Sequence, residues 1–286
     1  MAIVIGIANK SLPPDAVLEG RYKITGISSI RNEVVYQARD MHFHHIARYV
    51  AIKEVRKITF NPDNDSWMFY NFGYVSDLFA SLSHPAIPKI FGHFSTIDGR
   101  YVVMDCINGR DLGTLIQSTS SFLPTALLMK WAVQLCDVLH YLHTHLPEPI
   151  IFRNAKPSTI MINQYGDVRL IDLVNVRVFW GQLYWIMSNA GAYSPPEPDN
   201  MRPCPASDLY SLGATLHYAL TRQDPNDELP LSFDKRPIRA INPSVSPALE
   251  AIILRAVAVE PKDRYSSAFQ MKQALEVLLV AKSKSA

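Results

Sequence analysis

Short apolar segments rich in Ile, Val and Tyr recur through the first hundred residues, and polar turns separate them. This pattern predicts β-strands over residues 21–26, 33–39, 49–55, 89–94 and 100–105. Between the third and fourth strands the apolar residues follow the helical period, at Phe72, Val75, Phe79 and Leu82. The N-terminal part is therefore expected to be a five-stranded antiparallel sheet with one helix over residues 65–83.

After Gly109 the apolar residues recur mainly at helical spacing. Apolar stripes predict helices that begin at Pro124 or Thr125 and that cover residues 207–221, 246–259 and 266–282. Two short strand-like pieces lie at 160–163 and 168–171. The pattern indicates an α+β chain of two lobes with a hinge near residues 106–111. The expected divisions are an N-terminal extension at 1–20, a first lobe at 21–107 and a mainly α-helical second lobe at 108–286.

Composition narrows the class of protein. The 286 residues are 48% hydrophobic and 19% charged, which excludes a disordered chain, and the net charge of +2 gives no reason to expect a nucleic-acid partner. The three cysteines lie far apart without a CxxC pair, so we expect neither a zinc ribbon nor a disulfide framework. No apolar run reaches about 20 residues, so no membrane span is expected. A cytoplasmic location fits these features.

Six short motifs follow one another in a fixed order. They are YVAIK at 49–53, FRNAKP at 152–157, IDLV at 171–174, YSPPE at 193–197, SDLYSLG at 207–213 and PKDR at 261–264. Together they resemble the protein kinase family, most closely bacterial Ser/Thr kinases of the eukaryotic-like type, from about residue 21 to residue 279. The resemblance implies the bilobal protein-kinase fold. Fold alone does not decide activity, which depends on the parts of the phosphoryl-transfer machinery that the chain keeps.

The resemblance implies a site for ATP with Mg²⁺. In a kinase the lysine of the first motif, here Lys53, contacts the α- and β-phosphates, although here it could equally form an internal salt bridge. The resemblance also places side chains or backbone around the adenine and ribose, and these positions are Val35, Ala51, Asp105, Ile107, Asp111 and Met161. The adenine pocket could be open or filled by the chain's own side chains. The metal ligands implied are Asp172 and, less well suited, Thr159, which replaces an asparagine.

The catalytic loop departs from the family pattern at its central residue. Asn154 stands where the resemblance implies the aspartate that accepts the substrate's proton, and an amide is not a base at physiological pH. Such a base is typically worth about 10²–10⁴-fold in rate. Lys156, which would neutralise the transferring phosphate, is retained. Conventional catalysis is therefore not expected.

Two further parts of the phosphate site differ. The three positions of the family's glycine-rich loop hold Ser28, Ile30 and Glu33, so a plain β-hairpin is expected there in place of a phosphate clamp. Val75 stands at the place of the helix glutamate that pairs with Lys53 in the family. The nearby Asp77 is turned about 200° away from that position on the helix.

The second lobe keeps the family's structural residues. The resemblance implies that Arg264 pairs with Glu197 and that Asp208 opens the long central helix. Residues 179–187 are unusually rich in apolar and aromatic side chains, among them Trp180, Tyr184 and Trp185. These aromatic residues could fold back into the protein, or they could form an exposed patch that docks another protein.

The hypothesis that accounts for these substitutions is a pseudokinase, a kinase-like protein that has lost phosphoryl transfer and acts by binding. It would scaffold or allosterically regulate a signalling partner, such as an active bacterial kinase. The alternative is an enzyme, a weakly active or atypical ATP-dependent Ser/Thr kinase. Retention of Lys53, Lys156 and Asp172 supports that alternative.

Overall fold

The chain is described by a computed structural model that covers residues 11–30, 33–55, 72–97, 99–147, 149–172, 191–197, 204–227 and 233–283. The aromatic segment with Trp180, Tyr184 and Trp185 lies outside these ranges, as does the predicted start of the first helix at 65–71. The chain divides into two compact units, Met1–Leu82 with Lys89–Ile107 and Ser83–Pro88 with Asn108–Ala286.

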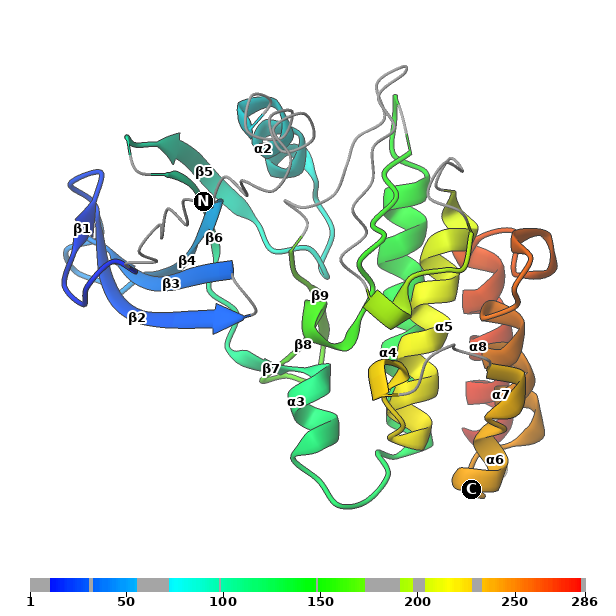
Figure 1. Cartoon of the computed structure of the whole chain (residues 1–286). Helices are drawn as coiled ribbons and strands as arrows, with labels where there is room; N and C mark the ends of the chain where they lie inside the picture. The colour runs from blue at the N-terminus through cyan, green and yellow to red at the C-terminus, as the bar shows by residue number, and fades with distance from the viewer. Residues whose placement is uncertain are drawn as a thin grey trace, which may run out of the picture. The chain divides into compact units, whose positions relative to one another are not determined.

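The first unit is a curled antiparallel sheet (Figure 1). In spatial order its strands are β1 (Val17–Leu18), β2 (Tyr22–Ile30), β3 (Glu33–Asp40), β4 (Tyr49–Val55), β6 (Arg100–Asp105) and β5 (Ile90–Ser95). The five predicted strands are present. The prediction of five was nevertheless one strand short, because β1 belongs to the N-terminal extension and pairs with β2 through only two residues. Two residues carry too little pattern to predict a strand.

Alternation along β4 separates the two faces of the sheet. Val50 and Ile52 are buried in a core on one face, and Leu12 and Ala16 of the N-terminal segment pack against that core. Ala51 and Lys53 belong to the opposite face, where Lys53 is only 4% exposed. The extension at 11–18 therefore covers the core face of the sheet.

The helix α2 (Phe72–Ser81) packs against β5. It buries Phe72, Val75 and Phe79, and the Phe72 ring meets the His93 ring edge-on with centroids 5.4 Å apart. The buried residues recur at three- and four-residue spacing, as the sequence pattern predicted.

The second unit combines a small sheet with a helical body (Figure 1). The sheet order is β7 (Gly109–Asp111), β8 (Ile160–Asn163) and β9 (Val168–Leu170). The helices are α3 (Leu112–Gln117), α4 (Thr125–His143), α5 (Pro205–Thr221), α6 (Ile238–Ile241), α7 (Pro247–Ala256) and α8 (Ala268–Ser283). Short 3₁₀ segments are η1 (Pro157–Thr159), η3 (Gly191–Tyr193), η4 (Pro225–Asp227), η5 (Phe233–Lys235) and η6 (Pro261–Asp263). Within the described ranges, no helix combines the length and the apolar character that a membrane span needs.

Glycine is required at two contacts of the second unit. A Cβ at Gly109 would collide with the carbonyl oxygen of Ile162, because β7 and β8 approach closely there. A Cβ at Gly213 would lie 2.8 Å from side-chain carbons of Ala256 and Val257, so α5 and the end of α7 can meet only at a residue without a side chain.

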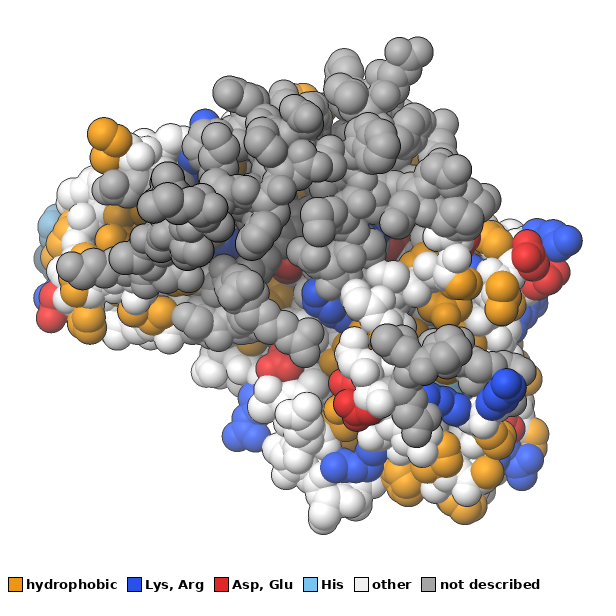
Figure 2. Space-filling view, viewed as in Figure 1, with side chains coloured by type: hydrophobic (Ala, Val, Ile, Leu, Met, Phe, Trp, Pro, Cys, Tyr) orange, Lys and Arg blue, Asp and Glu red, His pale blue; other side chains and the backbone are white. Residues whose placement is uncertain are grey.

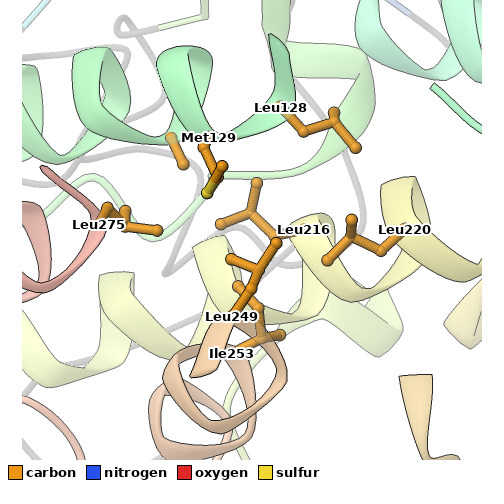
Figure 3. Close-up of a pocket in the computed structure, with 8 residues that line it drawn as sticks. Leu128, Met129, Leu216, Leu220, Leu249, Ile253 and Leu275 are labelled. Carbon is orange, nitrogen blue, oxygen red and sulfur yellow. The ribbon is translucent and has the colours of Figure 1, made fainter. Parts of the chain in front are cut away.

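A small apolar void lies within the packing of the described helices. Side chains of α4, α5, α7 and α8 surround an apolar void of about 10 Å³, and Figure 3 shows Met129, Leu216, Leu249 and Ile253 around it. This volume holds at most one water molecule. The void is therefore part of the hydrophobic core and is too small for a ligand.

Enlarging this void should destabilise the protein. We expect Leu216→Ala to lower the free energy of unfolding by about 2–5 kcal/mol, because Leu216 is only 3% exposed and the cavity left behind adds to the lost burial. The matched control is Val277→Ala on α8, where the side chain is 67% exposed and the change should stay within about 0.5 kcal/mol. Urea unfolding measures both, and equal effects would contradict this packing.

Stability should also fall in mild acid. His217 of α5 is fully buried, its Nε2 lies 2.9 Å from the carbonyl oxygen of Arg236, and burial lowers its pKa. Below the unfolded value of about 6.5, protons bind preferentially to the unfolded chain, so stability is lost as the pH falls from there toward the lowered pKa. We expect the free energy of unfolding, measured by denaturant titration over this pH range, to fall less steeply for His217→Gln than for the wild type. Equal slopes for the two proteins would contradict a neutral buried imidazole.

Candidate active site

The loop that precedes η1 is held by the carboxylate of Asp208. Asp208 lies in the first turn of α5 and is fully buried. It accepts hydrogen bonds from the backbone N–H of Phe152 at 2.8 Å and of Arg153 at 2.5 Å. A third bond comes from Nε2 of His143, at the end of α4, at 2.8 Å. The loop backbone and the end of α4 are thus fastened to one charged group.

A second contact from α5 continues this attachment. Thr215 follows Asp208 by seven residues, about two helical turns, so the two side chains lie on the same helix face. The Thr215 hydroxyl donates to the carbonyl oxygen of Ala155 at 2.7 Å. Asn154 thus lies between two loop residues, Arg153 and Ala155, that side chains of α5 hold by hydrogen bonds.

Asn154 contacts the residue that the resemblance assigns to metal binding. Its Nδ2 donates to Oδ2 of Asp172 at 3.0 Å. The Oδ1 atom of Asn154 is buried and has no hydrogen-bond partner among the described residues. The opposite orientation of the amide would set two oxygen atoms against each other, so the donor must face the carboxylate.

Two residues of this site adopt the left-handed backbone conformation. The φ angle is +55° at Arg153 and +71° at Asp172, values that residues other than glycine rarely adopt. Such residues persist only where surrounding contacts determine them, and here the Asp208 and Asn154 bonds do so.

Thr159 closes the loop from within. Its hydroxyl donates to the carbonyl oxygen of Asn154, lies 3.0 Å from that of Lys156, and accepts from the Lys156 N–H at 3.2 Å. The residue is only 3% exposed. The hydroxyl is therefore committed to the loop backbone, and the metal-ligand role suggested for Thr159 has no support from its contacts.

Among the residues that the structure describes, those at the expected metal positions do not fit a pair of Mg²⁺ ions. Mg²⁺ is usually bound through one or two carboxylates together with phosphate oxygens and water. At the positions the resemblance assigns to metal, Asp172 supplies one carboxylate, one of whose oxygens already accepts from Asn154, and the Thr159 hydroxyl is taken. No step that depends on two metal ions follows from this arrangement.

The first unit brings together part of the predicted nucleotide surface. Val35 lies directly opposite Lys53 in the β3–β4 pairing, and Ala51 lies opposite Met104 of β6. Val35, Ala51 and Met104 are half-buried. These residues share the sheet face opposite the core. Met161, which was assigned to the same surface, lies in β8 of the second unit and is also half-buried.

The predicted hinge and ribose residues have local roles. Oδ2 of Asp105 accepts from the Lys89 N–H at 2.9 Å, which joins the end of β6 to the start of β5, and Ile107 is half-buried. Asp111 caps α3, accepting from the N–H of Thr114 at 2.8 Å and from its hydroxyl at 2.5 Å. Their contacts with adenine or ribose remain predictions.

The phosphate loop and the first helix differ from the family pattern in structure as well. β2 runs to Ile30 and β3 begins at Glu33, with Ser28 paired to Val35, so all three expected glycine positions are strand positions. Val75 is 1% exposed in the core. Asp77 is turned outward, where its carboxylate is 77% exposed and lies 3.0 Å from Nε2 of His93, as the helical offset predicted.

The ion pair expected between Glu197 and Arg264 is present. The guanidinium donates to both carboxylate oxygens at 2.7 Å and also to the carbonyl oxygens of Ala258, Val259 and Ala206. Arg264 stacks over the Tyr210 ring at 4.8 Å, and burial raises the pKa of Tyr210 to about 12. This pair fixes Glu197 against α5 and the loop after α7.

Sequence reasoning missed two residues of the site, His143 and Thr215. Thr215 carries a signal, since it lies two turns after Asp208 on the same face of α5. His143 carries none, because its bond to Asp208 depends on how α4 packs against α5.

Comparison with known proteins identifies the family of the chain. The family model of the protein kinase domain matches residues 33–277. The serine/threonine-protein kinase C of Synechocystis sp. is 30% identical over 256 residues, which cover 84% of this chain and 46% of that protein. The kinase PknB of Mycolicibacterium smegmatis is 28% identical over 256 residues, which cover 83% of this chain and 39% of that protein. The chain thus spans less than half the length of these relatives.

A solved structure shows the same fold. The crystal structure of the Mycobacterium tuberculosis PknI kinase domain superimposes with a TM-score of 0.73 at 19% identity, covering 93% of this chain and 99% of that one. The extent of the family match, the sequence relatives and the fold lead to one conclusion: this chain belongs to the protein kinase family, among relatives that are bacterial Ser/Thr protein kinases.

Proposed function

We propose that this chain is a catalytically impaired member of the protein kinase family, a pseudokinase, that regulates a signalling partner by binding it. One observation carries the proposal. The residue at the catalytic-base position is Asn154, and its amide donates to Asp172 at 3.0 Å. An amide is not a base at physiological pH, and here its nitrogen is directed at a carboxylate, so Asn154 cannot take the proton of a substrate hydroxyl.

The retained contacts support a binding role. Asp208, Thr215 and the Glu197–Arg264 pair keep the architecture of the second unit in place although the base is missing. Members of this family generally use ATP and Mg²⁺, and residual ATP binding is part of the proposal. The partner that we propose is a protein, such as an active bacterial kinase, and the setting is the cytoplasm.

Surface charge does not favour a nucleic-acid partner. The chain carries a net charge of +2, and Figure 2 shows basic and acidic side chains interspersed over the visible face of the second unit. Nucleic-acid binding relies on a dense basic field, which interspersed charges do not create.

The second candidate function is a weakly active or atypical ATP-dependent Ser/Thr kinase. It is favoured by retention of Lys53, Lys156 and Asp172 and by the names of the relatives. The two candidates differ in whether phosphate is transferred at all.

Transfer of labelled phosphate from ATP to protein decides between them. We expect the wild type to incorporate no more label than the Asp172→Ala variant, because the base is absent. Asn154→Asp should raise incorporation by about 10²-fold, the lower end of the usual value of a general base, since the other departures remain. Wild-type incorporation that Asp172→Ala abolishes would instead establish the enzyme.

The aromatic segment offers a test of partner docking. If Trp180 and Trp185 anchor a partner, the double Ala variant should lose partner binding while its melting temperature stays unchanged, since such aromatic anchors dominate interface energy. The partner can be isolated with the wild-type chain and retested by calorimetry. A lower melting temperature with binding retained would show that the aromatics pack within the protein.

A further inference from the structure

The loop between β3 and β4 of the first unit exposes a group of apolar and aromatic side chains. All of its residues from 41 to 47 are exposed. Single apolar residues on a surface are ordinary, whereas several gathered around one loop indicate an interaction site. The exposed apolar side chains of this loop and of the strands beside it, which together with Arg48 we call the loop patch, are Met41, Phe43, Ile46, Tyr49 and Phe91.

Arg48 holds the loop patch together. Its Cζ lies 4.8 Å from the centroid of the Phe43 ring and 4.3 Å from that of the Phe91 ring. The two rings belong to the loop and to β5, so the guanidinium joins segments that are far apart in the sequence. Rings that stack on a guanidinium occupy its faces and leave the N–H groups in its plane able to donate.

The loop patch carries positive charge that no neighbouring carboxylate neutralises. Among the described residues, no carboxylate forms an ion pair with Arg48, and residues 41–49 contain no Asp or Glu. Asp40 is only 1% exposed and accepts two bonds from Arg21, at 2.8 and 2.7 Å. Asp105, at the end of β6, accepts the Lys89 N–H at 2.9 Å. Both carboxylates are therefore engaged elsewhere, and the patch is complementary to an acidic ligand.

This chemistry favours a protein segment over a membrane surface. Anionic membranes are bound by clusters of several Lys and Arg, whereas residues 41–49 contain one arginine. A planar guanidinium held in a fixed direction is suited to a single carboxylate, which it binds through two parallel hydrogen bonds. Arg and Tyr are also among the residues that dominate binding at protein interfaces.

We propose that the loop patch docks an acidic segment of a partner protein. One carboxylate of the segment binds the guanidinium of Arg48, and apolar side chains beside that carboxylate pack on Ile46 and Tyr49. The inference rests on the partner binding of the proposed function, and it names the surface and the kind of segment. The loop patch belongs to the first unit and is separate in sequence from the aromatic segment at 179–187.

Fluorescence anisotropy with short labelled peptides tests the proposal on the whole chain. The probe is a peptide of alternating Glu and Leu. One comparison peptide alternates Glu and Ser, which removes the apolar side chains, and the other alternates Lys and Leu, which reverses the charge. We expect the Glu–Leu peptide to bind at least about tenfold more tightly than either. Equal binding of a comparison peptide, or no binding of the Glu–Leu peptide, would overturn the proposal.

Substitution of Arg48 tests the carboxylate contact. Arg48→Gln should weaken binding of the Glu–Leu peptide at least about fivefold, and Arg48→Lys should not restore it, because lysine lacks the planar fork. The control is Arg100→Gln, which removes the same charge at the other end of β4, where Arg100 lies opposite Val55 and over the Phe72 ring. This control should bind like the wild type, and equal losses in both variants would contradict a specific contact.

A second variant keeps the proposal falsifiable if Arg48→Gln fails to fold. Ile46 is 71% exposed, so Ile46→Glu should leave the melting temperature unchanged. It should abolish binding of the Glu–Leu peptide, because it replaces an apolar contact by a like charge. Retained binding would overturn the proposal.

The other possible ligand class and the proposed function are tested separately. The wild type should not sediment with vesicles of phosphatidylserine and phosphatidylcholine, and sedimentation that Arg48→Gln abolishes would assign the loop patch to a membrane instead. Failure of the loop patch leaves regulation through another surface intact. Asp172-dependent phosphate transfer by the wild type overturns the proposed function, whatever the peptides show.

Discussion

The carboxylate of Asp208 is fully buried at the start of α5, and its hydrogen bonds determine the geometry of the site. Two of them fix the consecutive backbone N–H groups of Phe152 and Arg153, and the third fixes the end of α4. A buried charge is stable only when its hydrogen-bonding capacity is used, so the loop, α4 and α5 depend on one another. The left-handed conformation at Arg153 is one local consequence.

Because Asp208 holds the loop backbone, the geometry of the loop does not depend on the chemistry of the side chain at position 154. The backbone that presents residue 154 is held by Asp208 and Thr215, which do not depend on the identity of that side chain. An amide can therefore replace a carboxylate without loss of the surrounding structure. The replacement turns a proton acceptor into a hydrogen-bond donor and directs it at Asp172. The loss of the base therefore leaves the surrounding backbone in place.

The fold was largely predictable because its strands and helices carry strong local patterns. Tyr49–Val55 has the predicted bounds, and α5 begins two residues before its predicted start. Strand β1 was missed because its two residues form a strand only by pairing with β2. The hydrophobic pattern of a segment reflects only its local preference, whereas the pairing of β1 with β2 is a tertiary interaction.

The site was predictable in its residue types and less so in its contacts. Motif order placed Asn154, Asp172, Asp208 and the Glu197–Arg264 pair. The direction of the Asn154 amide, the inward hydroxyl of Thr159 and the bond from His143 depend on side-chain orientation and helix packing, which spacing does not determine.

A crystal structure with a non-hydrolysable ATP analogue and a bound Ser peptide tests the central claim most directly. The account predicts that the amide of residue 154 still donates to Asp172 and that no carboxylate lies within hydrogen-bond distance of the Ser hydroxyl. A different Asp or Glu side chain within about 3 Å of that hydroxyl, in line with the γ-phosphate, would supply the missing base and contradict the account.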